Sequence, residues 1–424
     1  MKVMKWSVIA MAVAAGTSQM ALASSQSESE GFVEGSSLTI FNRNLYMNRD
    51  FRDNGASPPT TGGNGQSYRE AWGHGFIGTF ESGFTQGTVG VGVDAIGLLG
   101  VKLDSGEGRA WPDIFPRDSE GKPQDDYSHA GAAIKFRASD TVLKYGTQFV
   151  ALPVFSTDDA RLLPETAQGG LITSSEIDGL ELNVGRFTAL SAKSETDHDS
   201  RTLEQLSLVG GTYAFSDQLS ASLYYSDVKT DEVADDFSKK YANLNYSMPV
   251  GGDQSVALDF NIYQTKWDDA DDSKNVIWSL ASTYKLGAHG FTLAYQKSTG
   301  ERGYEYGPDG GGTIWLANSV QYQDFQYENE KSWQVRYDLD MSAYGVSGLS
   351  FMTRYVDGSN ATNGDGVSGL EESEWDIEAK YVIQDGPAKD LSFRVRQAFY
   401  QADSALDNDL SDTRLIVEYP LSIL

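Results

Sequence analysis

Positively charged side chains recur at alternating positions in several short segments, and they are the residues with the clearest chemistry. Arg394 and Arg396, for example, alternate with the apolar Phe393 and Val395. A guanidinium group can grip a carboxylate with two parallel hydrogen bonds, and several weak sites in a row favour passage of an anion over trapping. Cations at equivalent polar positions form a set that we call the basic ladder: Lys135, Arg137, Lys144, Arg336, Arg354, Lys380, Arg394, Arg396 and Arg414.

The segments that carry these cations have the period of a β-strand. In residues 391–396 the apolar and polar side chains fall on opposite faces, and residues 333–339 and 256–263 repeat this separation. A helix would mix the two kinds of side chain on every face, whereas a strand separates them. Each predicted strand therefore has one apolar face and one polar face.

The connections between the predicted strands alternate between short and long. Short connections rich in turn-forming residues lie at 139–140, 177–179, 216–217, 251–253, 287–290, 344–346 and 385–387. Long polar stretches lie near 45–68, 104–127, 151–168, 192–203, 227–238, 267–273, 300–329, 357–372 and 402–411. This plan predicts an all-β protein, an antiparallel transmembrane β-barrel of about eighteen strands with short periplasmic turns and long extracellular loops.

In such a barrel the apolar face of each strand meets lipid and the polar face lines a water-filled lumen. A cation that faced lipid at mid-depth would cost about 2–4 kcal/mol, so the basic ladder is expected inside the lumen. Trp333, Tyr355, Trp375, Tyr381 and Tyr419 near strand ends are expected at the lipid headgroups. A soluble β-sandwich would show the same alternation, but about eighteen strands exceed the usual sandwich.

The beginning of the chain indicates export. Lys2 and Lys5 precede a short apolar run, and Ala21-Leu22-Ala23 provides small residues for cleavage, so residues 1–23 are predicted to be a signal peptide. Residues 24–424 are predicted to form one transmembrane β-barrel porin domain in the bacterial outer membrane. Its expected partners are outer-membrane lipid and lipopolysaccharide, and both a monomer and a homotrimer remain open.

Composition excludes several other classes of protein. The net charge is -27, and removal of residues 1–23 would delete two lysines and no acid, leaving -29, which argues against nucleic acid as a partner. The chain has no cysteine, so disulfides and thiolate metal sites are excluded. A stripe of arginines inside so acidic a protein predicts a locally positive wall, because a narrow pore focuses the field of its lining charges.

An enzyme is the main rival to a pore. His74, His129, His198 and His289 are scattered and no nucleophile motif accompanies them, so no catalytic residue, metal site or cofactor is expected. The acidic run at 268–272 could bind a divalent cation but is more often a solvated loop. The alternatives left open are an outer-membrane barrel hydrolase, a general non-selective diffusion pore, and a purely structural or adhesive barrel.

The purpose of the ladder cations also remains open at this point. Each of them could pair with a lumen acid such as Asp338, Asp376, Glu378 or Glu418 and only hold the wall together. The other interpretation is that they form the path of an anionic solute.

Several stretches of the chain resemble one known family over nearly all of the predicted mature chain. These stretches are residues 42–46, 48–50, 82–90, 161–164, 316–322 and 389–397. They are similar to the OprD-like porins of pseudomonads, the outer-membrane carboxylate channels. The resemblance implies substrate-selective passive diffusion of small water-soluble carboxylates, such as amino acids or aromatic and organic acids.

The resemblance also implies roles for particular residues. It implies that the third and seventh long loops fold inward and narrow the pore, with a basic ladder on one wall and an acidic or polar patch opposite. Arg394 and Arg396 match the ladder pair, with Lys380 and Arg414 as neighbours. The inward loops are matched by Arg161 in the third and by Ser319, Tyr322 and Asp324 in the seventh.

Overall fold

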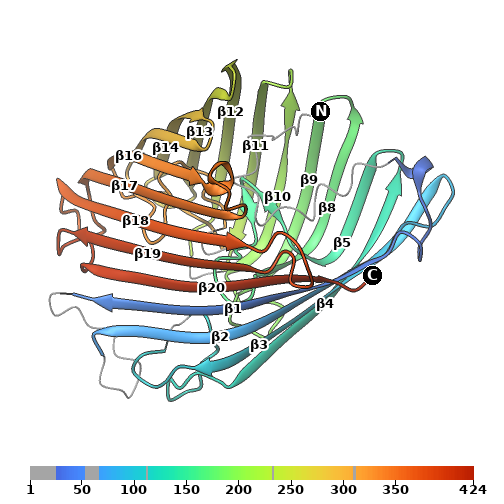
Figure 1. The fold of residues 1–424 in the computed structure, drawn as a ribbon, viewed down its shortest axis with the longest axis horizontal. Helices are drawn as coiled ribbons and strands as arrows, with labels where there is room; N and C mark the ends of the chain where they lie inside the picture. The colour runs from blue at the N-terminus through green and yellow to red at the C-terminus, as the bar shows by residue number, and fades with distance from the viewer. Residues whose placement is uncertain (1–24, 53–65, 111–112, 232–233, 309–311) are drawn as a thin grey trace.

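The computed structural model describes residues 25–52, 66–110, 113–231, 234–308 and 312–424. Within these residues eighteen strands form one antiparallel sheet, and β1 pairs with both β2 and β20, so the sheet closes into a barrel (Figure 1). The strands of the barrel are β1 (Ser37–Phe51), β2 (Tyr68–Glu81), β3 (Val89–Asp104), β4 (Asp126–Ala138), β5 (Thr141–Gln148), β8 (Thr166–Ile177), β9 (Leu180–Ser191), β10 (Leu203–Ala214), β11 (Leu219–Thr230), β12 (Phe237–Gly251), β13 (Gln254–Trp267), β14 (Lys274–Leu286), β15 (His289–Gly300), β16 (Lys331–Asp340), β17 (Leu349–Ala361), β18 (Leu370–Val382), β19 (Ser392–Ala402) and β20 (Leu410–Ser422).

The remaining elements are short. Strands β6 (Ala151–Leu152) and β7 (Phe155–Ser156) pair with each other outside the barrel sheet. The 3-10 turns are η3 (Gln26–Glu28) and η4 (Met341–Tyr344). No helix in the described part of the chain is both long and apolar enough to cross a membrane.

Short and long connections alternate around the barrel, as the sequence predicts. Strand β1 begins and β20 ends at the short-turn end, at the right of Figure 1. Three of the connections at the other end matter below, and we call them L3 (149–165), L7 (301–330) and L9 (403–409). The predicted eighteen-stranded antiparallel barrel is confirmed.

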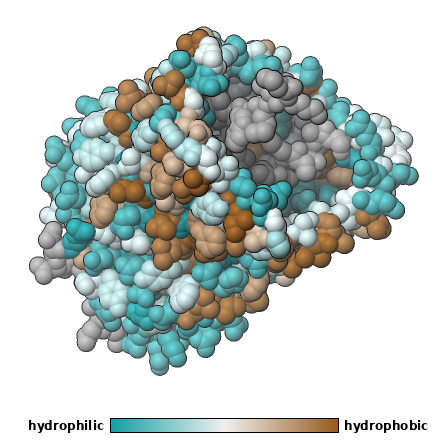
Figure 2. Space-filling model, in the orientation of Figure 1, coloured by the Kyte–Doolittle hydropathy of each residue, from teal (hydrophilic) through white to brown (hydrophobic). Residues whose placement is uncertain are grey.

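The two faces of each strand differ in the expected way. The side chains of Phe393 and Val395 on β19 are 44% and 50% exposed on the outer surface, whereas their neighbours Ser392 and Ala398 are buried on the inner face. Figure 2 shows hydrophobic side chains gathered in patches on the outer wall, with hydrophilic side chains around them. The apolar face is therefore the outer one, and polar side chains line the interior.

The first long loop begins later than the sequence predicts. Residues 45–51 were expected in the loop but belong to β1, because Leu45 and Met47 break the alternation by placing apolar side chains on the inner face. Both are buried in a cluster that includes Leu162 and Leu163 of L3. The inner wall is thus apolar where a loop packs against it. The predicted signal peptide, residues 1–23, lies outside the described residues.

Candidate functional site

Loop L3 is fastened to the inner wall by a buried arginine of β1. The Nη1 and Nη2 atoms of Arg43 donate to the two carboxylate oxygens of Asp159 at 2.7 and 3.0 Å, and Nη1 also donates to the carbonyl oxygen of Arg161 at 2.8 Å. The Nε atom of Arg43 donates to Glu418 at 3.1 Å. One side chain therefore joins β1 and β20 to the middle of L3.

Glycines on the inner face of β2 let L3 approach the wall closely. A Cβ atom at Gly73 would lie 2.7 Å from Leu162 Cδ2, and one at Gly75 would lie 2.8 Å from the carbonyl oxygen of Leu162. Either substitution would push the loop away from the wall. The half-buried Arg161 lies in this part of L3, where burial and the neighbouring Arg414 guanidinium lower the pKa of its side chain.

Loop L7 is fastened to the inner wall at β18 and β20. The backbone N–H groups of Tyr322 and Gln323 donate to the carboxylate of Glu374 on β18 at 2.9 and 2.8 Å. Arg414 on β20 donates from Nη2 to the carbonyl oxygen of Gln321 at 2.7 Å. The hydroxyl of Tyr322 donates to Asp407. Residues 321–323 therefore lie directly against the wall that carries the ladder.

Ser319 and Asp324, the other predicted constriction residues in L7, hydrogen-bond to each other. The hydroxyl groups of Ser319 and Tyr306 both donate to the Asp324 carboxylate. Burial raises the pKa of Asp324, and the two hydroxyl donors oppose that change. The structure thus brings Ser319, Tyr322 and Asp324 together in one segment of L7, inside the barrel.

L3 and L7 also pack on each other. Their apolar side chains share one buried cluster with the inner faces of β8 to β14, in which Phe155 of L3 and Leu316 of L7 take part. The Tyr263 hydroxyl on β13 donates to the carbonyl oxygen of Pro153 at 3.1 Å and accepts from the Trp315 N–H at 3.3 Å. The two loops therefore occupy the lumen on that side of the barrel.

Six of the predicted ladder cations lie on the neighbouring strands β16 to β20. In the register of the sheet Arg394 stands opposite Lys380, Arg396 opposite Glu378 and Arg414, and Arg354 opposite Arg336. Three of these six cations form close ion pairs with acids on the barrel wall. Arg336 pairs with Asp338 at 2.7 Å, Arg354 with Asp376 at 2.6 Å, and Arg414 with Asp412 at 2.7 Å.

Of the other three cations, Arg394 and Arg396 share one acid and Lys380 has none within ion-pair distance in the described residues. The Nε atoms of Arg394 and Arg396 lie 3.6 and 3.1 Å from the carboxylate of Glu378, but neither Nε makes a hydrogen bond of normal geometry. The side chains of Arg394 and Arg396 are 24% and 20% exposed, so solvent in the lumen reaches them. These three side chains carry a local excess of positive charge.

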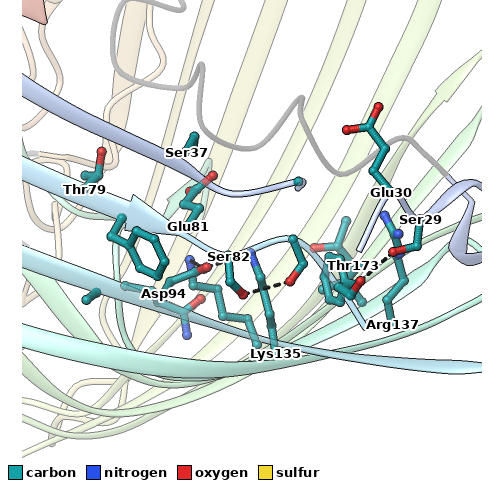
Figure 3. Close-up of a pocket in the computed structure, with 18 of the residues that line it drawn as sticks. Ser29, Glu30, Ser37, Thr79, Glu81, Ser82, Asp94, Lys135, Arg137 and Thr173 are labelled. Carbon is teal, nitrogen blue, oxygen red and sulfur yellow. Dashed lines mark hydrogen bonds and ion pairs between the residues drawn. The ribbon is translucent and has the colours of Figure 1, made fainter. Parts of the chain in front are cut away.

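Lys135, Arg137 and Lys144 lie elsewhere, on β4 and β5, where they line a cavity of about 590 Å³ near the short-turn end (Figure 3). Lys135 and Lys144 both pair with Asp94, each at 2.6 Å. Arg137 donates from Nε to the Gln26 side chain at 3.0 Å, and its guanidinium lies 4.2 Å from the ring centroid of Phe84. The basic ladder therefore divides into two groups on different strands.

Several residues that hold the loops were not singled out from the sequence. Glu372 and Glu374 occupy alternating inner positions of β18 with Asp376, and this spacing could have identified them as lumen acids. Lys239 on β12 is buried and donates to the carbonyl oxygens of Glu305 and Tyr306 in L7 at 2.7 and 2.9 Å. No sequence signal distinguishes Lys239 from the adjacent Lys240.

The acidic run at 268–272 forms ion pairs within the protein. Asp272 pairs with Lys266 at 2.7 Å and Asp269 with Arg302 at 2.9 Å. In the described residues no group of three or more His, Asp or Glu side chains is arranged to hold a metal ion.

Comparisons with known proteins agree with this architecture. Residues 30–423 match the family described as outer membrane porin, OprD family. The chain is 46% identical to Porin D of Pseudomonas aeruginosa over an alignment of 462 positions that covers all of both chains. Among solved structures it is similar to Acinetobacter baumannii OccAB1, with 31% identity, a TM-score of 0.86 and coverage of 94% of this chain and 99% of that one. It is also similar to Pseudomonas aeruginosa OpdK, solved with vanillate, with 34% identity, a TM-score of 0.82 and coverage of 92% and 100%.

Proposed function

Because this chain belongs to the OprD family of outer membrane porins, it is a channel for small solutes in the bacterial outer membrane, and we propose that Lys380, Arg394 and Arg396 select carboxylate-containing solutes. Its relatives are porins, which sets aside the barrel hydrolase that the sequence left open.

One observation carries the proposal: among the described residues, Arg394 and Arg396 share a single ion-pair partner, Glu378, and the neighbouring Lys380 has none. A solute carboxylate that enters this part of the lumen meets two partly exposed guanidinium groups that share one acid, Glu378, in the described residues. Charge-assisted hydrogen bonds of this kind contribute about 1.5–3 kcal/mol each. The paired cations Arg336, Arg354 and Arg414 contribute to the field and to the rigidity of the wall.

The remaining predicted site residues have different parts in the proposal. Lys135 and Arg137 line the cavity at the short-turn end, where they lie on the route of a solute that leaves the pore toward the periplasm. Arg161 of L3 and Ser319, Tyr322 and Asp324 of L7 narrow the pore beside the free cations. The hydrogen bonds of Tyr322 and Gln323 to Glu374 support this role, because they fix L7 against β18.

The solute class has independent support from a relative. The OpdK structure was solved with vanillate, an aromatic carboxylate. Transfer of this chemistry to the present chain rests on the partly exposed guanidinium groups of Arg394 and Arg396, which share Glu378. Aromatic and organic acids and amino acids all carry the carboxylate that these groups bind.

Uptake into liposomes tests the proposal. The purified barrel should admit amino acids, aromatic acids and sugar acids faster than neutral solutes of equal size, and the double change Arg394→Gln with Arg396→Gln should remove most of that preference. Arg336→Gln is the matched control, since it deletes a lumen charge that Asp338 already neutralises. Equal uptake of charged and neutral solutes by the unaltered protein would instead indicate a general diffusion pore.

Three further points belong to the proposal. The outer wall contacts membrane lipid, and we propose that its extracellular half contacts lipopolysaccharide. Native mass spectrometry in detergent will distinguish a monomer from a homotrimer.

Residues 1–23 are proposed to be removed on export, which the intact mass of the membrane-inserted protein will test.

A further inference from the structure

Two buried glutamates meet at the C-terminal end of L7, where the loop joins β16 of the barrel wall. Glu330, the last residue of L7, is 0% exposed, and Glu372 on β18 is 3% exposed. Glu330 Oε1 and Glu372 Cγ both lie against Gly358 of β17, so the two side chains are close neighbours. Two buried carboxylates in this position would repel each other and can only accept hydrogen bonds, so a proton shared between them is what allows the two groups to lie together.

The Oε2 atom of each glutamate accepts hydrogen bonds from neighbouring groups. Glu372 Oε2 accepts from the Tyr400 hydroxyl on β19 and from Gln323 Nε2 at 2.9 Å, while Glu330 Oε2 accepts from the Tyr327 N–H at 2.9 Å. This leaves one oxygen on each carboxyl, Oε1, with no other donor in the described residues. Each Oε1 is thus available to the facing carboxyl.

No cation neutralises this pair. None of the ion pairs in the described residues includes Glu330 or Glu372, and Arg354, the one cation of β17, pairs with Asp376. The titratable groups that surround the pair are Tyr400 from β19, Tyr327 from L7 and Asp407 from L9. All three are neutral or negative, so they do not favour a second negative charge. Burial and the facing carboxyl of Glu372 raise the pKa of Glu330 well above its ordinary value.

A glycine on the neighbouring strand makes room for the contact. A Cβ atom at Gly358 on β17 would lie 2.4 Å from Glu330 Oε1 and 3.2 Å from Glu372 Cγ. The backbone of β17 therefore lies so close to the two carboxyl groups that no side chain would fit at position 358 without moving them.

A second pair of buried acids, Glu374 and Asp376, occupies the next inner positions along β18. Asp376 accepts from Arg354 Nε at 2.6 Å, and both Glu374 oxygens accept from backbone N–H groups of L7. This second pair has a cation, Arg354, and only its Asp376 Oδ1 atom lacks a donor in the described residues. The Glu330–Glu372 pair has no such cation in the described part of the chain.

We propose that Glu330 and Glu372 are positioning residues of the pore. Their shared proton fixes the C-terminal end of L7 against β18, and the position of L7 sets the width of the channel. When hydroxide in the lumen water removes this proton, two carboxylates face each other without a counter-ion, and repulsion loosens L7. The inference rests on the proposed function, since it requires that L7 borders the conducting path.

Single-channel recording across about pH 5 to pH 9 tests this inference. The unaltered protein should show a steady conductance at low pH, when L7 is fixed, and increasingly frequent changes of conductance as the pH rises and L7 loosens. Because each pH unit changes the ratio of ionised to protonated pairs tenfold, the frequency should rise by up to roughly tenfold per unit within the titration range.

Two conservative variants distinguish the effect of the shared proton on L7 from the effect of side-chain packing. Glu330→Gln or Glu372→Gln replaces the proton by an amide donor, so each variant should keep L7 fixed at every pH, and either one suffices if the other fails to insert. Glu371→Gln, an exposed neighbour, is the matched control and should keep the pH dependence. A pH-independent unaltered channel, or an unchanged pH profile in both Gln variants, would overturn the inference. Failure of the proposed function is recognised separately, by loss of carboxylate preference at a constant pH.

Discussion

The Nε atom of Arg396 lies 3.1 Å from the carboxylate of Glu378, and the same carboxylate is the only acid within ion-pair distance of Arg394 in the described residues. Glu378 is therefore an internal competitor for any solute carboxylate. Both partners are about one-fifth exposed, so solvent weakens the pair and a solute can displace Glu378.

Removal of this competitor should strengthen solute binding. In Glu378→Gln the guanidinium groups of Arg394 and Arg396 lose their shared partner, and we expect the apparent affinity for a small carboxylate to rise by roughly 1 kcal/mol, or about fivefold. Solute-induced current block measures this affinity. Glu418→Gln is the control, because Arg43 keeps Asp159 as its partner. Weaker binding in Glu378→Gln would show that Glu378 orients the arginines instead.

The close approach of L3 to β2 predicts an effect on conductance. Gly75→Val would place a side chain where the carbonyl oxygen of Leu162 lies 2.8 Å from the added Cβ, so L3 must move, at a cost of about 1–3 kcal/mol. We expect a larger or noisier single-channel conductance. Gly97→Val, at a glycine with no atom within 4 Å of the added Cβ, provides the control. Equal conductance in both variants would show that L3 does not border the path.

Lys239 should stabilise the outer part of L7. Its ammonium group donates to two L7 carbonyl oxygens, and Lys239→Met leaves these buried acceptors unpaired at about 1–3 kcal/mol each. Protease cleavage within residues 301–330 should therefore become faster, while the barrel itself stays heat-resistant on a gel. Lys240→Met is the neighbouring control. Unchanged cleavage would mean that the packing of L7 on L3 is sufficient to hold it.

The connection between β13 and β14 should keep its structure in mild acid. Hydrogen bonds from Ser273, together with the nearby Arg302, hold the pKa of Asp269 below its ordinary value of about 4. A carboxyl with a lowered folded-state pKa contributes stability above its unfolded pKa and loses it as the pH falls through the folded value. Hydrogen exchange at the Ser273 N–H, which donates to Asp269 at 2.8 Å, should remain slow at about pH 5 and accelerate only below about pH 4. Acceleration already at pH 5 would contradict this.

The sequence predicted the barrel well because lipid and water impose opposite polarity on the two faces of each strand. The prediction failed at residues 45–51, where L3 covers the inner face and makes it apolar. Alternation also placed the cations in the lumen but could not tell the paired Arg354 from the free Lys380. That difference depends on which acid lies beside each cation across the sheet, which only the register shows.

The inward loops illustrate a second limit. Their fixed points are single contacts between residues far apart in the chain, such as Arg43 with Asp159 and Tyr322 with Glu374. No local pattern encodes such a contact. The predictions for Ser319, Tyr322 and Asp324 therefore rest on family resemblance alone.

The central claim is that Lys380, Arg394 and Arg396 make the pore selective for anions, and the reversal potential of the purified channel in a salt gradient tests it most directly. The account predicts an anion-selective potential that moves toward cation selectivity in a Lys380→Met, Arg394→Gln, Arg396→Gln variant but changes little in Arg336→Gln. A potential that is the same in the triple variant and in the unaltered protein would contradict the claim.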